Sequence, residues 1–327
     1  MTNNNKNFII KTYIGLVVAV LIIGGLIWLA NKDKNKVLND PTSGAPAVLI
    51  ADEVNSIDTD CVNNYSIAFN NKSLNLLGDN KLIRYDDKLG GDSGGSFNDN
   101  QQRRCIAFDD VGGLYMGGNN IEVITGEPDF ASISLKCPTD AIITSIAISE
   151  DFIYAADAGH RCILRFKRDG LSNETKPEMF QKDFDIKSPY FDLAFANDKL
   201  FAADPGRHKI KVFDEMGCEL SSWGRGANCD EGFFGCCNPA NFALLSDGSF
   251  VTIEKGKVRV KLYSPEGNYI GMIADPELFK DHRLAIQTKD TAANHIALDV
   301  AVDKADNIYI MEPLTGKIRI FKLKNGQ

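Results

Sequence analysis

The feature that most limits how this chain can fold is a short motif that recurs six times along it. Its clearest copy, residues 191–217 (FDLAFANDKLFAADPGRHKIKVFDEMG), reads as three strands separated by turns at residues 197–198 and 204–206. Every copy carries an alanine directly after a large apolar residue in its first strand. These alanines are Ala68, Ala107, Ala147, Ala194, Ala243 and Ala301, spaced by 39, 40, 47, 49 and 58 residues.

The repeat predicts an all-β fold, a six-bladed β-propeller with four-stranded blades. Its apolar residues alternate with a period of two, as in strands, and a meander this small cannot bury its apolar faces alone. The spacing of the copies fits one four-stranded blade per copy, with loops that lengthen toward the C-terminus. A small alanine in the strand nearest the axis would let neighbouring blades approach one another.

The end of the last copy predicts how the ring closes. This copy finishes its third strand near residue 321, with few residues left for an outer strand. We expect the apolar residues 47–51 to supply that strand and so to join the first and last blades. Outer strands are expected at residues 132–136, 220–223 and 269–273. Residues 86–103, which contain GGDSGGS, offer no fourth strand to the first blade, and a helical turn is expected at residues 276–282.

The N-terminal residues predict a membrane anchor. Residues 13–30 (YIGLVVAVLIIGGLIWLA) contain no charge, and 18 residues reach about 27 Å in a helix, close to the thickness of a bilayer core. Tyr13 and Trp28 lie at its ends, as interfacial aromatics do. A cleaved signal peptide is the alternative, but Trp28 stands where cleavage needs a small residue. We therefore expect a cytoplasmic tail and signal anchor at residues 1–36, a stalk at 37–46 and the propeller at 47–327.

Cysteine content and charge indicate where the propeller works. Eight cysteines are typical of an oxidising compartment, which favours disulfide bonds and an extracytoplasmic domain on a single-pass inner-membrane protein. The lysines flanking the span slightly favour the opposite orientation. Residues 1–36 carry a net charge of +4 within the chain's total of −8, which leaves −12 for residues 37–327. An acidic domain binds polyanions poorly, so no nucleic acid partner is expected.

Two of the copies carry a resemblance to a known family. LAFANDKLFAADPGRHKIKVFDEMG and IAISEDFIYAADAGHRCILRFKRDG resemble the NHL repeat, and the similarity extends over residues 60–324. The second copy has Gly118 where the repeat has aspartate, and the fifth and sixth have Glu254 and Glu312. The chain also looks like bacterial membrane-anchored NHL-repeat proteins of unestablished activity. The resemblance implies a six-bladed propeller but does not choose among protein-binding, RNA-binding, lyase and hydrolase members.

Propeller geometry predicts which residues share one face. Loops between second and third strands emerge beside the connectors that enter each first strand, so a pocket on this face would draw on both. The candidate ligand-binding residues are Cys236, Cys237, Asn238, Glu254, Lys255, Arg207, Arg161, Asp157 and Asp204. The acidic and basic members recur from copy to copy, which equally fits ion pairs and turn bonds that hold the blades together.

The cysteines around the GCCNP segment admit three interpretations. Disulfides with Cys218, Cys229 or Cys61 are favoured for an exported domain, since a bridge between the neighbours Cys236 and Cys237 would close a strained ring. A metal site is the second interpretation, although the paired Cys-x-x-Cys of structural zinc is missing. A reactive thiol pair is the third.

Three histidines suggest a metal site on the same face. His160 and His208 occupy nearly equivalent places in adjacent copies, and His295 precedes the sixth first strand. Three histidines that converge on the axis could hold a divalent metal with an open position, whereas histidines bonded in turns or to solvent are the simpler interpretation.

These observations support three functional hypotheses and leave open whether the protein is an enzyme. The leading one is a membrane-tethered propeller that binds a protein, peptide or small molecule on the face bearing GCCNP. The alternatives are a metal-dependent lyase or hydrolase and a thiol-redox protein that use the same face. No complete catalytic triad, phosphate-binding glycine loop or zincin helix occurs in the sequence.

Overall fold

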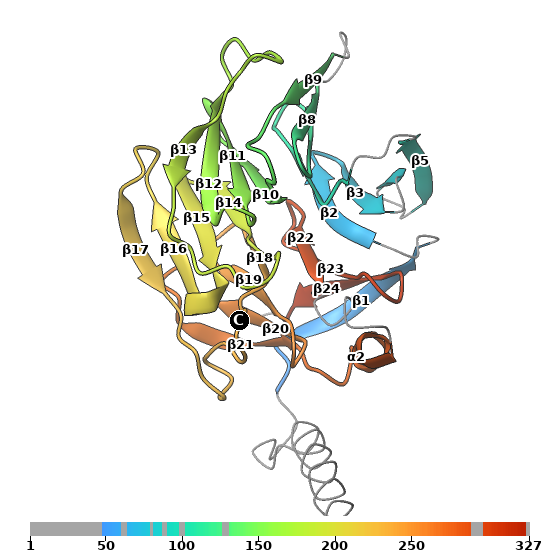
Figure 1. Cartoon of the computed structure of the whole chain (residues 1–327). Helices are drawn as coiled ribbons and strands as arrows, with labels where there is room; N and C mark the ends of the chain where they lie inside the picture. Colours follow the sequence, from blue (N-terminus) through green and yellow to red (C-terminus); the bar gives the residue numbers. More distant parts are fainter. Residues whose placement is uncertain are drawn as a thin grey trace, which may run out of the picture. The chain divides into compact units, whose positions relative to one another are not determined.

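The computed structural model describes residues 48–324 of the chain, apart from residues 60–63, 79–80, 87–89, 98–101, 126–130 and 289–296. Six four-stranded antiparallel sheets make up this part (Figure 1). The first three sheets are formed by β2 (Asn64–Asn70), β3 (Ser73–Gly78), β4 (Lys81–Tyr85) and β5 (Gly91–Ser96); β6 (Cys105–Phe108), β7 (Leu114–Gly117), β8 (Ile121–Ile124) and β9 (Ser132–Leu135); and β10 (Ile143–Ile148), β11 (Phe152–Asp157), β12 (Cys162–Lys167) and β13 (Glu178–Gln181).

The other three sheets repeat this order, and the last borrows its outer strand from the N-terminal side. They are formed by β14 (Leu193–Ala196), β15 (Lys199–Asp204), β16 (Lys209–Phe213) and β17 (Glu219–Trp223); β18 (Asn241–Leu244), β19 (Phe250–Glu254), β20 (Arg259–Tyr263) and β21 (Tyr269–Ala274); and β22 (Asp299–Val302), β23 (Ile308–Glu312), β24 (Lys317–Leu323) and β1 (Ala51–Asp58).

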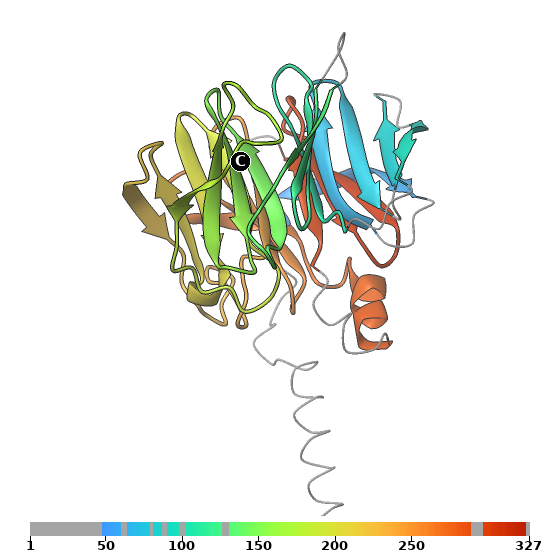
Figure 2. The same ribbon diagram turned by 45° about the horizontal axis from the view of Figure 1, so that its top comes forward.

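The first strands of the six sheets form a closed ring. Each of β2, β6, β10, β14, β18 and β22 neighbours the next, and β22 neighbours β2 again (Figures 1 and 2). The predicted six-bladed propeller with four-stranded blades is therefore confirmed. Five of the six repeat alanines border the space at the centre of this ring, all except Ala147.

Strand β1 closes the ring, although over a different range from the one predicted. It pairs antiparallel with β24, from Ala51 opposite Leu323 to Asp58 opposite Lys317, and so gives the sixth sheet its outer strand. The prediction of residues 47–51 was wrong in position, because Leu49 forms a parallel bridge to Met272 of β21 instead. The apolar side chains of Ala51 and Ile57 are buried, whereas the residues between them are exposed.

The first blade contains a fourth strand that the sequence analysis did not predict. β5 has the sequence GDSGGS, which shows no apolar alternation, yet it pairs along β4 from Lys81 to Tyr85. A Cβ atom at Gly91 would lie 2.9 Å from the Tyr85 ring, so glycine is what lets this edge strand approach its neighbour. The predicted outer strands β9, β17 and β21 are confirmed to within one residue at either end.

Two further predictions concern helices. The turn expected at residues 276–282 is a helix, α2, that begins later and spans Lys280–Thr288. Within the described part of the chain, no helix is both long and apolar enough to cross a bilayer. The predicted anchor at residues 13–30 and the stalk at 37–46 lie outside the described residues.

Candidate functional site

The centre of the ring holds a cavity of about 640 Å³ that all six first strands line. This volume lies within the range of small-molecule sites in proteins. Axial cavities bordered by several blades bring together residues that are far apart in the sequence, and here the lining extends from Ser66 to Leu314.

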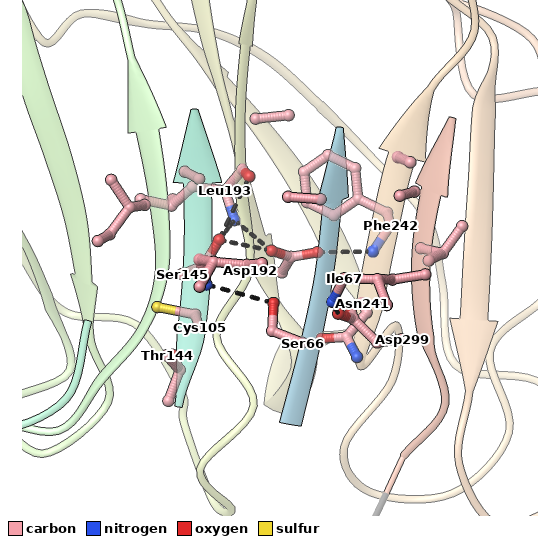
Figure 3. Close-up of a pocket in the computed structure, with 18 of the residues that line it drawn as sticks. Ser66, Ile67, Cys105, Thr144, Ser145, Asp192, Leu193, Asn241, Phe242 and Asp299 are labelled. Atoms are coloured by element: carbon pink, nitrogen blue, oxygen red, sulfur yellow. Dashed lines mark hydrogen bonds between the residues drawn. The ribbon is translucent and has the colours of Figure 1, made fainter. Parts of the chain in front are cut away.

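A ring of polar side chains surrounds this cavity at one position of the repeat. The position lies two residues before each repeat alanine, and all six side chains there line the cavity (Figure 3). They are Ser66, Cys105, Ser145, Asp192, Asn241 and Asp299. We call this set the axial polar ring. This set was not among the residues predicted from the sequence, although superposing the six copies at their alanines shows that no copy has an aliphatic or aromatic residue there.

Most members of the axial polar ring hydrogen-bond to the backbone of the following blade. The carboxylate of Asp192 accepts the N–H of Phe242 at 2.7 Å, and that of Asp299 accepts the N–H of Ile67 at 2.8 Å. Both amides belong to the residue just before a repeat alanine. Asn241 instead donates its amide to the carbonyl of Leu298 at 2.6 Å. These bonds fix each side chain between two neighbouring blades.

Serine hydroxyls of neighbouring blades complete the hydrogen bonding of the two carboxylates. Ser145 donates its hydroxyl to Asp192 Oδ1 at 2.7 Å, and Ser66 hydrogen-bonds to Asp299 (Figure 3 shows the Asp192 contacts). The Leu193 N–H also donates to Asp192 Oδ1 at 2.9 Å. Each carboxylate is therefore held as a fixed acceptor that borders the cavity.

The two carboxylates carry charge that no cation compensates. Among the described residues, neither Asp192 nor Asp299 forms an ion pair. Removal from bulk water raises the pKa of Asp192 from 3.8 to about 6, although its hydrogen bonds partly oppose this rise. The pKa of Asp299 is raised to about 7, first by burial and then by the negative charge of Asp192. Burial together with both carboxylates also raises the pKa of the Cys105 thiol well above its usual value.

Apolar side chains line the cavity on the C-terminal side of the axial polar ring. They occupy the position after the repeat alanine in five copies: Phe69, Phe108, Phe195, Leu244 and Val302. Beyond the N-terminal ends of the first strands, the lining includes Arg104 and Tyr190. Arg104 is the only cation among the described residues of the lining; it donates to Gln102 at 2.7 Å, and its buried Nε–H has no hydrogen-bond partner.

The predicted acidic residues of the loops are buried and hold connectors in place. Asp157 and Asp204 end the second strands of their blades, and neither is exposed. Asp157 Oδ1 accepts the N–H of Ile142 at 3.0 Å, and Asp204 Oδ1 accepts that of Asp185 at 2.8 Å. Both amides lie in the connector that enters the same blade, so these carboxylates stabilise the blade ends. In the second blade, strand pairing aligns Gly118 with them, as the repeat predicts, because Tyr115 pairs with Ala107 just as Tyr154 pairs with Ala147.

Glu254 occupies the same place in the fifth blade and compensates two buried cations. Its carboxylate lies 2.7 Å from Arg259 Nη2 and 2.6 Å from Lys261 Nζ, and all three side chains are almost completely buried. It also accepts the N–H of Phe234 in the connector at 3.4 Å. None of these acidic residues lines the axial cavity.

The basic candidates lie around the same face. Arg207 pairs with Asp204 at 2.8 Å, and Arg161 is exposed in the turn that follows β11. Lys255 donates to Ser188 at 2.7 Å, and its ammonium lies 4.9 Å from the centre of the Tyr190 ring. Because Tyr190 lines the axial cavity, Lys255 connects the predicted face to that cavity.

The GCCNP segment packs against Lys255. Asn238 Oδ1 accepts the Lys255 N–H at 2.9 Å, and Asn238 Nδ2 donates to the Lys255 carbonyl at 3.1 Å. All seven cysteines in the described part of the chain are free thiols, so the expected disulfides are not confirmed; Cys61 lies outside that part. The Sγ atoms of Cys236 and Cys237 are 3.1 Å apart.

The histidines proposed as metal ligands have other partners where they are described. His160 Nδ1 lies 2.7 Å from Asp157, and His208 Nδ1 lies 3.2 Å from the Asn238 carbonyl. His295 lies outside the described residues. Within the described residues, no group of three or more histidine, cysteine or acidic side chains is placed to hold a metal ion. The three-histidine metal site remains a prediction, which elemental analysis of the purified protein would test.

No protein-family model matches the chain, and no curated protein matches it in sequence. Solved structures do match it. A gluconolactonase from Xanthomonas campestris is 14% identical, with a TM-score of 0.58 over 82% of this chain and 88% of that one. Virginiamycin B lyase from Staphylococcus aureus is 11% identical, with a TM-score of 0.55 over 84% of this chain and 100% of that one. The WD40 β-propeller domain of Doa1 is 12% identical, with a TM-score of 0.53 over 85% and 99%. These similarities show the propeller fold.

Proposed function

We propose that the axial cavity binds a small molecule that carries a protonated amine on an apolar body. The observation that carries this proposal is the pair of carboxylates, Asp192 and Asp299, that border the cavity without a cationic partner among the described residues. A bound ammonium would supply the missing positive charge and donate hydrogen bonds to acceptors that the blades already hold in place.

Charge and hydrogen bonding together favour a cation over a neutral ligand. A carboxylate has about four acceptor sites, and Asp192 uses three of them on Ser145, Leu193 and Phe242. Burial of an uncompensated charge is costly, and the raised pKa values of both carboxylates reflect that cost. A cation next to them removes the penalty, whereas an alcohol would only add one hydrogen bond.

The rest of the lining sets the other properties of the ligand. The rings of Phe69, Phe108 and Phe195 provide an apolar wall next to the axial polar ring, which suits an aromatic or aliphatic body. On the other side of the axial polar ring from these phenylalanines, the unpartnered Nε–H of Arg104 would donate a hydrogen bond to an acceptor atom of the ligand. Propellers of the same fold include virginiamycin B lyase and a gluconolactonase, so enzymes named for small-molecule substrates occur on this fold.

The same proposal places the propeller outside the inner membrane, tethered by the apolar residues 13–30. Its support is the uncharged run itself and the number of cysteines, as given in the sequence analysis. Fractionation of cells, followed by protease treatment of intact spheroplasts, tests this part of the proposal. Propeller that stays protected from the protease would contradict it.

Calorimetric titration with matched probes tests the ligand class. The probes are phenethylamine, phenethyl alcohol and hydrocinnamate, together with the same three head groups on a cyclohexyl body. We expect at least one amine to bind, with its alcohol and carboxylate twins at least about tenfold weaker. Amine affinity should rise with pH as the carboxyls ionise around pH 6 and 7. Failure of both amines, or equal binding of a twin, would reject an ammonium ligand.

A second candidate function, hydrolysis or elimination, has one observation in its favour. The pKa of Asp299 is raised to about 7, which suits a group that transfers protons near neutral pH. Chromogenic esters and lactones screened against the protein and its Asp299→Asn variant test this function. Turnover that the variant loses would favour an enzyme, and equal rates in both proteins would reject Asp299 as its proton-transfer residue.

A further inference from the structure

Cys236 and Cys237 form an adjacent thiol pair at the edge of the predicted binding face. Their Sγ atoms are 3.1 Å apart, close enough for one thiol to hydrogen-bond to the other. The Cys236 side chain is exposed to solvent, whereas that of Cys237 is only 4% exposed. The pair therefore has one sulfur that a soluble reagent can reach and a second one directly behind it.

The backbone around the pair is held at both ends. Asn238 hydrogen-bonds to both the N–H and the carbonyl of Lys255, and its Nδ2 also donates to the Phe234 carbonyl. Gly235, directly before the pair, has a φ of 84°, a conformation that favours glycine. The two thiols are thus kept together by the fold and not only by their neighbouring positions in the sequence.

Lys255 places a positive charge next to both sulfurs. Burial lowers the pKa of its ammonium, and the charges of Cys237 and Cys236 oppose that change. For Cys236, the hydrogen bond with Cys237 and burial raise the thiol pKa, while Lys255 opposes the rise. The pKa of the Cys236 thiol is raised overall, and the Lys255 ammonium limits that rise and so favours the thiolate, which is the form that attacks disulfides.

We propose that Cys236 and Cys237 are a thiol–disulfide exchange site for small disulfides such as glutathione disulfide. The Cys236 thiolate attacks one sulfur of the small disulfide and releases one small thiolate, which leaves a mixed disulfide on Cys236. The Cys237 thiolate then attacks Cys236 Sγ, forms the bond between the two neighbours and releases the second small thiolate. The protein loses two electrons and two protons, and the small disulfide becomes two thiols.

A disulfide bond between Cys236 and Cys237 suits thiol–disulfide exchange better than a structural role. A disulfide between sequence neighbours closes a strained ring, and strained, exposed disulfides are the easily reduced ones. Neither cysteine lines the axial cavity, so the chemistry of this site is independent of the amine proposal. A negative result for the exchange site leaves the amine proposal standing, and a negative result for the amine site leaves the exchange proposal standing.

Mass spectrometry of the full-length protein tests the proposal. The reduced protein is incubated with glutathione disulfide, quenched with acid, alkylated and digested. We expect the peptide that contains Cys236 and Cys237 to lack two hydrogens and to carry no glutathione. The exposed Cys218 and Cys229, which have no adjacent thiol, should keep glutathione and provide the internal control.

Two variants separate the two steps. Cys237→Ser removes the second thiol, so glutathione should remain attached to Cys236, whereas Cys236→Ser should leave the buried Cys237 unmodified. Circular dichroism melting checks that both variants fold. If one variant does not fold, the mass of the wild-type peptide that contains Cys236 and Cys237 still tests whether the bond between them forms. Stable glutathione on wild-type Cys236, or a bond from either cysteine to Cys218 or Cys229, would overturn the proposal.

Discussion

Asp192, the residue directly before β14, accepts the backbone N–H of Phe242 in β18 at 2.7 Å, and it accepts a hydrogen bond from the Ser145 hydroxyl in β10 at the same distance. One carboxylate thus joins three consecutive blades. Asp299 joins two blades across the closure of the ring, where it links the sixth blade to Ser66 and Ile67 of the first. These bonds fix two negative charges on the axis, and the stability and the ligand preference of the propeller both depend on them.

The first prediction concerns stability and pH. The folded protein holds a proton on Asp192 up to about pH 6 and on Asp299 up to about pH 7, whereas unfolded aspartate releases it near 3.8. The folded state therefore binds more protons between these limits, and the contribution of both residues to stability falls as pH rises from about 4 to about 7. Asparagine at both positions keeps an oxygen for the backbone N–H and removes the titration.

Urea unfolding at a series of pH values measures this effect. The stability of Asp192→Asn/Asp299→Asn relative to wild type should increase with pH across that interval and then become constant. Asp198→Asn, at an exposed turn where asparagine is equally suited, is the control and should show no such slope. If the free energies of unfolding of the double variant and wild type changed with pH in parallel, the two carboxyls would not have raised pKa values in the folded protein.

The second prediction concerns the buried acidic residue of the fifth blade. Glu254→Gln removes the counter-charge of the buried Lys261 and one of the two acidic partners of the buried Arg259, which keeps Asp230, so it should reduce the free energy of unfolding by about 3–5 kcal/mol. The matched variant Glu277→Gln removes an exposed pair with Arg283 and should cost less than about 1 kcal/mol. Chemical denaturation measures both. Similar values for the two variants would show that Glu254 is not the compensating charge.

How far the sequence could lead is clearest at the repeat alanines. Ala68 and its equivalents predicted the number of blades and the position of their first strands, because close approach at the axis requires a small residue in every copy. β5 was missed since its pairing comes from backbone bonds and from glycine opposite Tyr85, and neither produces an apolar pattern. Residues 47–51 were chosen for their apolar side chains, whereas β1 buries only Ala51 and Ile57.

The candidate site was less predictable than the fold. Charged residues in turns, such as Asp157 and Glu254, attracted attention, yet the structure uses them to hold connectors and cations inside the blades. Ser66 and Asn241 are unremarkable one at a time. Their importance comes from the closure of six strands around one axis, which brings a single repeat position together from six distant segments. Uncompensated charge at that position becomes evident only when the surrounding side chains are known.

The third prediction concerns the closing strand. Removal of residues 1–58 deletes β1 and leaves β24 as an unpaired edge, whereas removal of residues 1–47 keeps β1 intact. Unpaired edge strands promote association and lower stability. We expect the shorter protein to melt at least several degrees lower and to associate in size-exclusion chromatography. Identical melting temperatures and elution volumes for the two truncated proteins would contradict the role of β1.

The decisive measurement is a calorimetric titration at pH 8 of the amine that binds wild type more tightly, phenethylamine or its cyclohexyl analogue, into wild type and into Asp192→Asn/Asp299→Asn. Both carboxyls are ionised in wild type at this pH and absent from the variant. A second titration into Glu277→Gln, whose exposed carboxylate is not part of the axial lining, is the control. We expect binding to wild type and to the control, and at least about a hundredfold weaker binding to the double variant. Equal affinity for all three proteins would contradict an ammonium site at Asp192 and Asp299.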